Sequence, residues 1–187
     1  MKEAVIVSTA RTPIGKAYRG SLNNIKGPQL AGHAIREAVS RAGLEPGEVD
    51  DLVMGCALQQ GTTGYNIGRN AALAAGLPVT VGGMSLDRQC SSGLYAIATA
   101  AKQVISDGVP VAVGAGVESI TLVQNEHMNN YLLHDEKLLA RHKDLYMPML
   151  QTAEVVANRY GVSREAQDEY ALQSQMRTAA AQEAGKF

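Results

Sequence analysis

The sequence contains very few aromatic residues, with no tryptophan, seven tyrosines and one phenylalanine, which is the last residue. Aromatic side chains often dominate the energetics of a core, so packing here must rely on alanine, valine, isoleucine, leucine and methionine. No apolar run approaches the roughly 20 residues that a transmembrane helix needs. The apolar stretch from Ala4 to Val7 is also too short for the core of a signal peptide. We therefore expect no membrane partner.

Neither sign of charge is in excess, because 17 lysines and arginines stand against 18 aspartates and glutamates, giving a net charge of −1. This balance gives no basis for a nucleic-acid partner or for binding to an anionic membrane. Cysteine is scarce as well. Cys56 and Cys90 lie 34 positions apart, without the spacing of a disulfide framework or a zinc site. We therefore predict a reducing, cytoplasmic location and no bound metal.

Short apolar runs alternate with segments in which apolar residues recur at helical spacing. This alternation is typical of an α/β layered fold with a largely parallel sheet. The runs are bounded by turn-forming residues, which indicates buried strands. Gly43 provides a stop for the first helix. We predict strands within residues 3–10, 50–58, 81–87 and 109–119, and helices over residues 26–43, 66–75 and 91–107.

The predicted helix over residues 91–107 is apolar or small on nearly every side until Lys102. A helix at a protein surface normally has a polar face, whereas a helix that is apolar all round is buried. We therefore expect this helix to lie between layers, with a sheet or helix packed on both sides.

The composition changes after Ser119. Residues 120–145 are rich in asparagine, histidine, lysine and aspartate and show no strand alternation. A helix is predicted from Pro148 to Gly161, and Ser163 is a suitable N-cap for a last helix. We therefore divide the chain into an α/β domain over residues 1–118 and a helical excursion over residues 119–187.

Cys90 is placed where a predicted strand ends and a helix begins, in the stretch SLDRQCSSGL. Backbone N–H groups and the helix dipole at that point favour the thiolate form and raise reactivity, and Gly93 leaves room for a ligand near the backbone. A small buried core residue is the other interpretation, since this is the commonest role of a free cysteine. On position alone both stay open. For Cys56, which ends a strand, we favour the core interpretation. No proton acceptor stands beside Cys90 in the sequence, and the four histidines lack metal-ligand spacing.

Four stretches together resemble the thiolase family of acyl-CoA acyltransferases. VIVSTARTPIGKAYRGSL, from residue 5, resembles the opening of that family, and RQCSSGLYAIATAA, from residue 88, resembles its nucleophile motif in the form typical of 3-ketoacyl-CoA thiolases. GAGVESIT, from residue 114, is similar to its Gly-Gly-x-Glu-Ser stretch. The segment from residue 151 to the end is similar to helices of its loop domain on the CoA side. The resemblance covers essentially the whole chain.

This resemblance implies a thiolase-like layered fold and a role for two residues. Cys90 matches the nucleophile that accepts the acyl group, and its own N–H would help to form an oxyanion hole. Met149 falls where the family has a methionine near the acyl or pantetheine end of CoA, although Leu150 replaces the usual glycine after it. Asp87 stands where many members have asparagine. Its carboxylate should oppose the thiolate, and Arg88 should offset this effect.

Family members are about twice as long, and their second half supplies the activating histidine and a second catalytic cysteine. The resemblance therefore implies an N-terminal half whose last strand and helix are missing, with residues 119–187 as part of the loop domain. It also implies CoA and acyl-CoA as substrates, no metal or redox cofactor, and a homodimer or homotetramer for the intact enzyme. One alternative is a related ketoacyl synthase, against which the stretches RQCSSG and QTAEVVANRYG argue. The alternative that stays open is a non-catalytic fragment that binds acyl-CoA or a partner.

Overall fold

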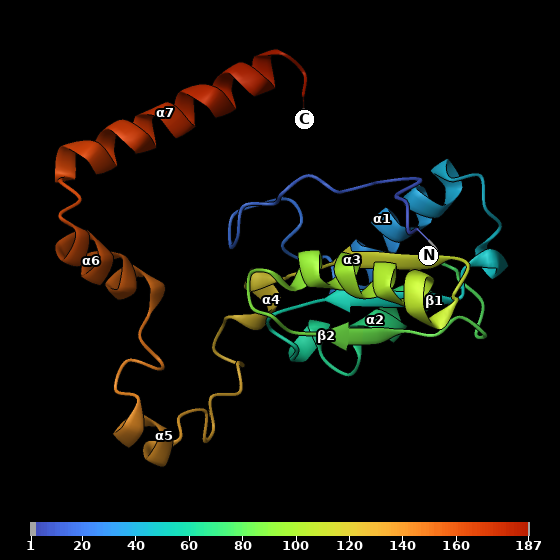
Figure 1. Ribbon diagram of the computed structural model, residues 1–187, viewed down its shortest axis with the longest axis horizontal. Helices are drawn as coiled ribbons and strands as arrows, with labels where there is room; N and C mark the ends of the chain where they lie inside the picture. The colour runs from blue at the N-terminus through green and yellow to red at the C-terminus, as the bar shows by residue number, and fades with distance from the viewer. Residues whose placement is uncertain (1–2, 187) are drawn as a thin grey trace. The chain divides into compact units, whose positions relative to one another are not determined.

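The structure is a computed structural model that describes residues 3–186. The chain divides into two compact units, one ending at Asn129 and the other beginning at Asn130 (Figure 1). The first unit contains the sheet and both cysteines, and the second unit is helical. Each unit is described by itself below.

The first unit is built on a parallel sheet of three short strands in the order β2-β1-β3. The central strand β1 pairs Val53 with Met84 on one side and with Gly114 on the other. Three consecutive residues of β1 are fully buried, as expected for a strand covered on both faces. The strands are β1 (Asp51–Gly55), β2 (Met84–Leu86) and β3 (Ala112–Gly116).

Helices cover both faces of this sheet. Leu52 and Met54 point to the face that packs against α1 and α2, whereas Val53 points to the opposite face and packs against Ala96 and Ala100 of α3. This alternation follows from the two-residue period of a strand, and it confirms the predicted α/β layered fold (Figure 1). The helices are α1 (Gly27–Arg41), α2 (Ile67–Ala74) and α3 (Ser92–Lys102), which continues as a π-helix over Gln103–Asp107.

Local sequence signals account for where these helices begin and end. Asn66 caps α2, its side-chain oxygen accepting a hydrogen bond from the Arg69 N–H at 3.2 Å. Gly43 follows α1 with a φ of +70°, a left-handed conformation that favours glycine. The unit is completed by 3₁₀ turns at Pro46–Glu48 and Gly61–Thr63 and by the short helix α4 (Ile120–Val123).

Two predictions of burial are wrong for the described residues. The apolar segment at residues 4–10 forms no strand, and Val5, Ile6 and Val7 are 73–74% exposed. In α3, Leu94 and Ile97 are 70% and 43% exposed, so one face of the helix packs on the sheet and the other is open. The physical reason is the same in both cases: a buried strand or a two-sided helix needs a covering layer, which the described residues do not supply.

An apolar groove of about 980 Å³ lies between the N-terminal segment and the sheet. Its walls include Ala34 and Ala38 of α1, Ile97 of α3, Val104 of the following π-helix, and Val113 of β3. The apolar segment therefore lines this groove and does not pair with the strands of the sheet.

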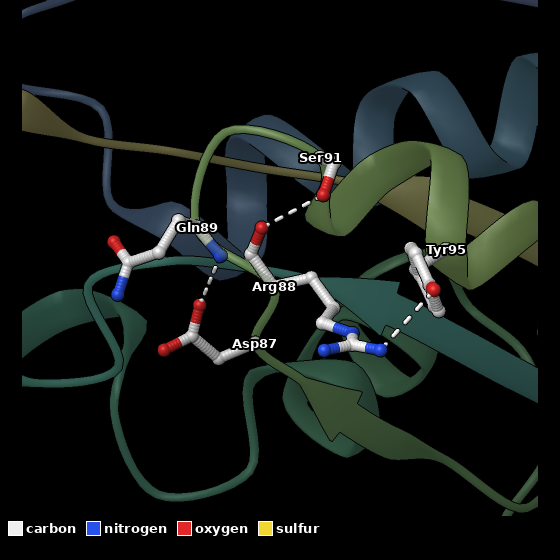
Figure 2. A pocket seen from close by; sticks show the side chains of 5 residues that line it. All are labelled: Asp87, Arg88, Gln89, Ser91 and Tyr95. Atoms are coloured by element: carbon white, nitrogen blue, oxygen red, sulfur yellow. Dashed lines mark hydrogen bonds between the residues drawn. The ribbon is translucent and has the colours of Figure 1, made fainter.

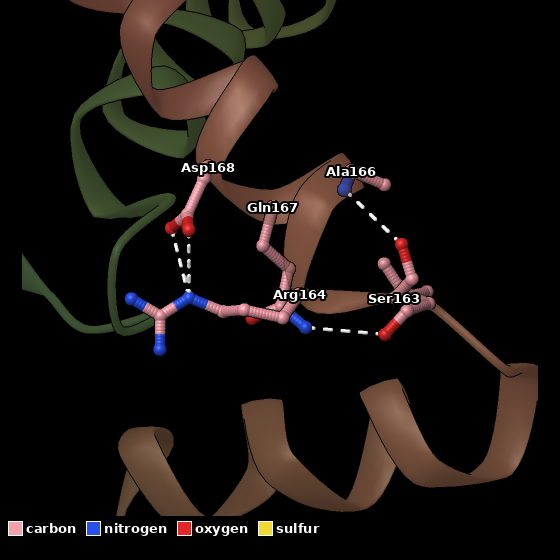
Figure 3. Close-up of polar contacts among 6 residues, drawn as sticks. Ser163, Arg164, Ala166, Gln167 and Asp168 are labelled. Carbon is pink, nitrogen blue, oxygen red and sulfur yellow. Dashed lines mark hydrogen bonds and ion pairs between the residues drawn. The ribbon is translucent and has the colours of Figure 1, made fainter.

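The second unit contains α5 (Glu136–Arg141), α6 (Met149–Tyr160) and α7 (Arg164–Glu183). Its two predicted helix boundaries are confirmed. Gly161 ends α6 with a φ of +64°, and the Ser163 Oγ accepts a hydrogen bond from the Ala166 N–H at 3.2 Å (Figure 3). Figure 3 also shows Arg164 paired with Asp168 one turn along α7, at 2.9 Å. No helix within residues 3–186 is long and apolar enough to cross a membrane.

Candidate active site

Cys90 lies in the turn that joins β2 to α3, two residues before the helix begins. Its side chain is exposed, whereas Cys56 is buried, as predicted for Cys56. Ser91 occupies the N-cap position of α3, but its side chain makes no capping bond to the helix. The Ser92 N–H instead donates to the Gln89 carbonyl at 3.0 Å, and Cys90 lies immediately before this first helical turn.

The turn around Cys90 is held by a compact set of hydrogen bonds (Figure 2). The Ser92 Oγ accepts from the Arg88 N–H at 2.9 Å and donates to the Gln89 carbonyl at 2.6 Å. The Ser91 Oγ donates to the Arg88 carbonyl at 2.8 Å. On the β2 side, the Asp87 carboxylate accepts from the Gln89 N–H at 2.6 Å. These bonds fix the backbone immediately before the thiol.

Glycines on one face of the sheet allow α3 to approach the strands backbone to backbone. A Cβ on Gly116 would lie 3.3 Å from the Gly93 Cα, and a Cβ on Gly114 would lie 2.7 Å from the Ile97 Cα. Gly55 is the tightest position, because a Cβ there would lie 2.2 Å from the Ser92 carbonyl carbon. The strand ends therefore determine where the N-terminus of α3 sits, and with it the position of Cys90.

A shallow hollow of about 510 Å³ adjoins the turn and is lined by Asp87, Arg88, Gln89, Ser91 and Tyr95 (Figure 2). The Arg88 guanidinium lies over the Tyr95 ring, 4.5 Å from its centroid, and donates a hydrogen bond to the Tyr95 hydroxyl at 3.1 Å. Among residues 3–186, Arg88 forms no ion pair with Asp87. The expected offset of the Asp87 charge by Arg88 therefore involves no direct ion pair in this part of the chain.

Cys56 lies at the end of β1 beside the carboxylate of Glu118. Its Sγ is 3.5 Å from the Glu118 Oε1, and the same carboxylate accepts hydrogen bonds from the Ala57 and Leu58 N–H groups at 2.9 and 3.2 Å. Burial, and secondly the Glu118 charge, raise the pKa of the Cys56 thiol from 9.0 to about 12. A thiol that stays protonated at neutral pH is a poor nucleophile, so Cys56 is a core residue, as predicted.

The raised pKa of Cys56 predicts a loss of stability at alkaline pH. Above pH 9 the unfolded chain releases this proton while the folded chain keeps it until about pH 12. The contribution of the protonated Cys56 thiol to the free energy of unfolding is therefore complete below pH 9, and it falls by about 1.4 kcal/mol per pH unit above pH 9. Between pH 8 and pH 10.5, urea unfolding of the native chain should lose about 2 kcal/mol more than that of Cys56→Ala. Equal losses in the two proteins would contradict the assignment.

Two predicted features of the site do not belong to the turn around Cys90. Met149 is the first residue of α6 in the second unit and is 75% exposed, and its role near CoA stays a prediction. Within residues 3–186, no histidine forms a hydrogen bond to Cys90, so the described chain provides the thiol without an adjacent base.

Sequence reasoning did not identify two contacts that shape the site. One is the bond from Asp87 to the Gln89 N–H, and the other is the contact of Glu118 with the loop after β1. From the sequence alone, Asp87 stands out only through the negative charge of its carboxylate. The signal for Glu118 was its place two residues after β3, where parallel strands end at the same edge of the sheet.

Comparisons with known proteins agree on one family. The sequence matches the family described as "Thiolase, N-terminal domain" over residues 4–187. A 3-ketoacyl-CoA thiolase of Bacillus subtilis is 43% identical over 187 residues, which cover 100% of this chain and 47% of that protein. An acetyl-CoA acetyltransferase of Cupriavidus necator is 39% identical over 197 residues, which cover 100% of this chain and 50% of that protein.

The fold comparison leads to the same family. The crystal structure of the Bacillus anthracis acetyl-CoA acetyltransferase matches this chain with a TM-score of 0.83 and 37% sequence identity, covering 100% of this chain and 49% of that one. The chain thus spans about half the length of the relatives that it matches. Because both sequence and fold match along nearly its whole length, the chain belongs to the thiolase family and corresponds to the N-terminal half of its longer members.

Proposed function

We propose that the protein transfers acyl groups between CoA thioesters through a covalent intermediate on Cys90. The observation that carries this proposal is the exposed Cys90 thiol at the N-terminus of α3, in a family whose relatives are named 3-ketoacyl-CoA thiolase and acetyl-CoA acetyltransferase. Covalent catalysis suits this chemistry because it divides one difficult substitution into two easier ones.

In the proposed first step, the Cys90 thiolate attacks the 3-keto carbon of a 3-ketoacyl-CoA. The bond between carbons 2 and 3 then breaks, acetyl-CoA leaves as its enolate and takes up a proton, and the acyl group remains on Cys90 as a thioester. In the second step the thiol of CoA loses its proton, attacks this thioester, and releases acyl-CoA and the Cys90 thiolate. The same steps in reverse join two acetyl-CoA molecules in a Claisen condensation.

Developing negative charge on the substrate oxygen requires hydrogen-bond donors fixed in advance. The Cys90 N–H forms no hydrogen bond to another residue within the described chain, so it can serve as one such donor. The rigid turn before Cys90 supports this role, because its backbone is held by Ser91 and Ser92. We propose Met149 as a contact for the acyl or pantetheine part of CoA.

The 187 residues alone are expected not to turn over substrate. The described chain has no base bonded to Cys90, and the chain spans about half the length of its relatives. We propose that the remaining half of a full-length protein supplies the proton acceptor, and that the full-length enzyme is a homodimer or homotetramer. The second candidate, a non-catalytic unit that binds acyl-CoA, is favoured for the isolated chain by the same absence of a bonded base.

The test compares this chain with the protein expressed from the complete reading frame that contains it. Both are incubated with acetoacetyl-CoA and CoA, and the loss of acetoacetyl-CoA is followed with time. A second sample is quenched in acid and mapped by mass spectrometry for an acetyl group on Cys90. We expect turnover and acetylation of Cys90 only in the longer protein. Acetyl groups on another residue would overturn the proposed intermediate, and turnover by the 187 residues would overturn the need for a second half.

A further inference from the structure

The residue before Cys90 has an unfavourable backbone conformation. Gln89 has a φ of +51°, in the left-handed region that residues with a Cβ rarely adopt. Such conformations cost free energy and persist only when neighbouring contacts hold them. Because Gln89 precedes Cys90 directly, its φ and ψ angles determine the direction in which the chain presents the thiol. The contacts that hold the peptide planes on either side of Gln89 therefore also hold Cys90.

Ser92 holds the peptide plane after Gln89, because its Oγ and its N–H both donate to the Gln89 carbonyl, and the side chain of Asp87 holds the peptide plane before it. The Asp87 Oδ1 accepts a hydrogen bond from the Gln89 N–H at 2.6 Å, closing a turn of the kind that aspartate and asparagine stabilise two residues ahead (Figure 2). The bonds made by Ser91 and Ser92 lie on the α3 side of the turn and involve the carbonyls of Arg88 and Gln89 and the Arg88 N–H. Asp87 is thus the side chain that satisfies the Gln89 N–H from the β2 side.

We propose that Asp87 is a positioning residue for Cys90, and that its side-chain oxygen keeps Gln89 left-handed and so holds the thiol at the N-terminus of α3. This proposal rests on the proposed function in taking Cys90 as the reactive group. Without the acceptor, the peptide plane between Arg88 and Gln89 can rotate and Gln89 relaxes toward a negative φ, which moves the Cys90 thiol away from its position at the N-terminus of α3. Asp87 itself does not touch the substrate.

A pair of uncharged variants separates the hydrogen bond from the charge. Asp87→Asn retains an acceptor oxygen at the same position, whereas Asp87→Ala removes it, and both lack the carboxylate charge. The rate at which iodoacetamide alkylates Cys90 is measured at pH 7.5 in the 187-residue chain by peptide mapping. We expect Asp87→Ala to react about two- to fivefold more slowly than Asp87→Asn, the range that a lost helix-terminus interaction implies.

A second pair, made in the Gln89→Gly background, tests whether Asp87 acts through this turn. Glycine adopts a positive φ without the steric cost, so the acceptor is no longer needed to hold the turn. The two Asp87 variants should then alkylate at the same rate in the Gln89→Gly chain. The double-mutant cycle measures the coupling between Asp87 and Gln89 directly.

Two outcomes would overturn the proposal: equal rates for Asp87→Asn and Asp87→Ala with Gln89 present, or an undiminished difference between them in the Gln89→Gly chain. Loss of the fold has its own signature, because the buried Cys56 would then be alkylated together with Cys90. If Asp87→Ala unfolds the chain, the test uses amide hydrogen exchange of the Gln89 N–H instead. We expect this N–H to exchange equally slowly in the native chain and in Asp87→Asn. Faster exchange in Asp87→Asn would overturn the proposal. Failure of the proposed function would appear separately as missing acetylation of Cys90, since alkylation uses no CoA thioester.

Discussion

Gly55→Ala is expected to lower the free energy of unfolding by about 3 kcal/mol, the upper end of the range for overpacked sites. A Cβ at this position would lie 2.2 Å from the carbonyl carbon of Ser92, 2.3 Å from its oxygen and 2.5 Å from the Gly93 nitrogen. All three are backbone atoms, so no side chain can rotate to make room. The first turn of α3 would have to move away from β1, and the packing of Val53 against Ala96 would be lost with it.

Gly93→Ala is the matched control for this substitution, because Gly93 lies in the facing helix of the same contact. A Cβ there would have only the Gly116 Cα within 4 Å, at the ordinary distance of 3.9 Å. Alanine is also the better helix former, so we expect Gly93→Ala to unfold at the native urea concentration or above it. The measurement is urea unfolding followed by circular dichroism. A Gly55→Ala protein as stable as the Gly93→Ala protein would contradict the close approach of α3 to β1.

The central part of the fold could be predicted because it depends on signals carried within single elements. The apolar run at β1 predicted a buried strand, and Leu52 and Met54 do face one layer of helices while Val53 faces the other. Helix ends were predicted from residues with a mechanism, such as Gly161, which ends α6 in a left-handed conformation.

The prediction failed where the outcome depends on a neighbouring layer. The residues at 4–10 are as apolar as those of β1, but a strand exists only when a partner accepts its backbone hydrogen bonds. The same holds for the outer face of α3, where Leu94 is 70% exposed in the described chain. The composition of a segment shows whether burial would be favourable. Whether the segment is buried depends on whether the tertiary structure provides a surface for it to pack against.

The candidate site shows the same division. The position of Cys90 between a strand and a helix could be predicted from the local pattern, as could the burial of Cys56. The contact between Cys56 and Glu118 joins residues 62 positions apart and depends on the parallel pairing of β1 with β3. The bond from Asp87 to Gln89 is local, but it depends on the left-handed φ of Gln89, and glutamine gives no signal for that conformation.

Cys90→Ala is expected to reduce the kcat of the full-length protein by a factor of about 10³ or more, because a covalent mechanism loses its nucleophile entirely. The measurement is the rate of acetoacetyl-CoA cleavage in the presence of CoA, with folding checked by circular dichroism. Cys90 is exposed and lies outside the buried core, so we expect the urea midpoint of this chain to stay within experimental error. An activity loss without a stability loss is the signature of a chemical role.

Cys56→Ala provides the opposite pattern and completes the comparison. Cys56 is 1% exposed and has a pKa raised to about 12, so its thiol is not available as a nucleophile at neutral pH. Its replacement removes one buried sulfur, and we expect a loss of about 1 kcal/mol in stability with a kcat within about threefold of the native value. If Cys56→Ala abolished turnover while Cys90→Ala preserved it, the nucleophile would have to be reassigned. The two substitutions together therefore separate a reactive cysteine from a structural one within a single chain.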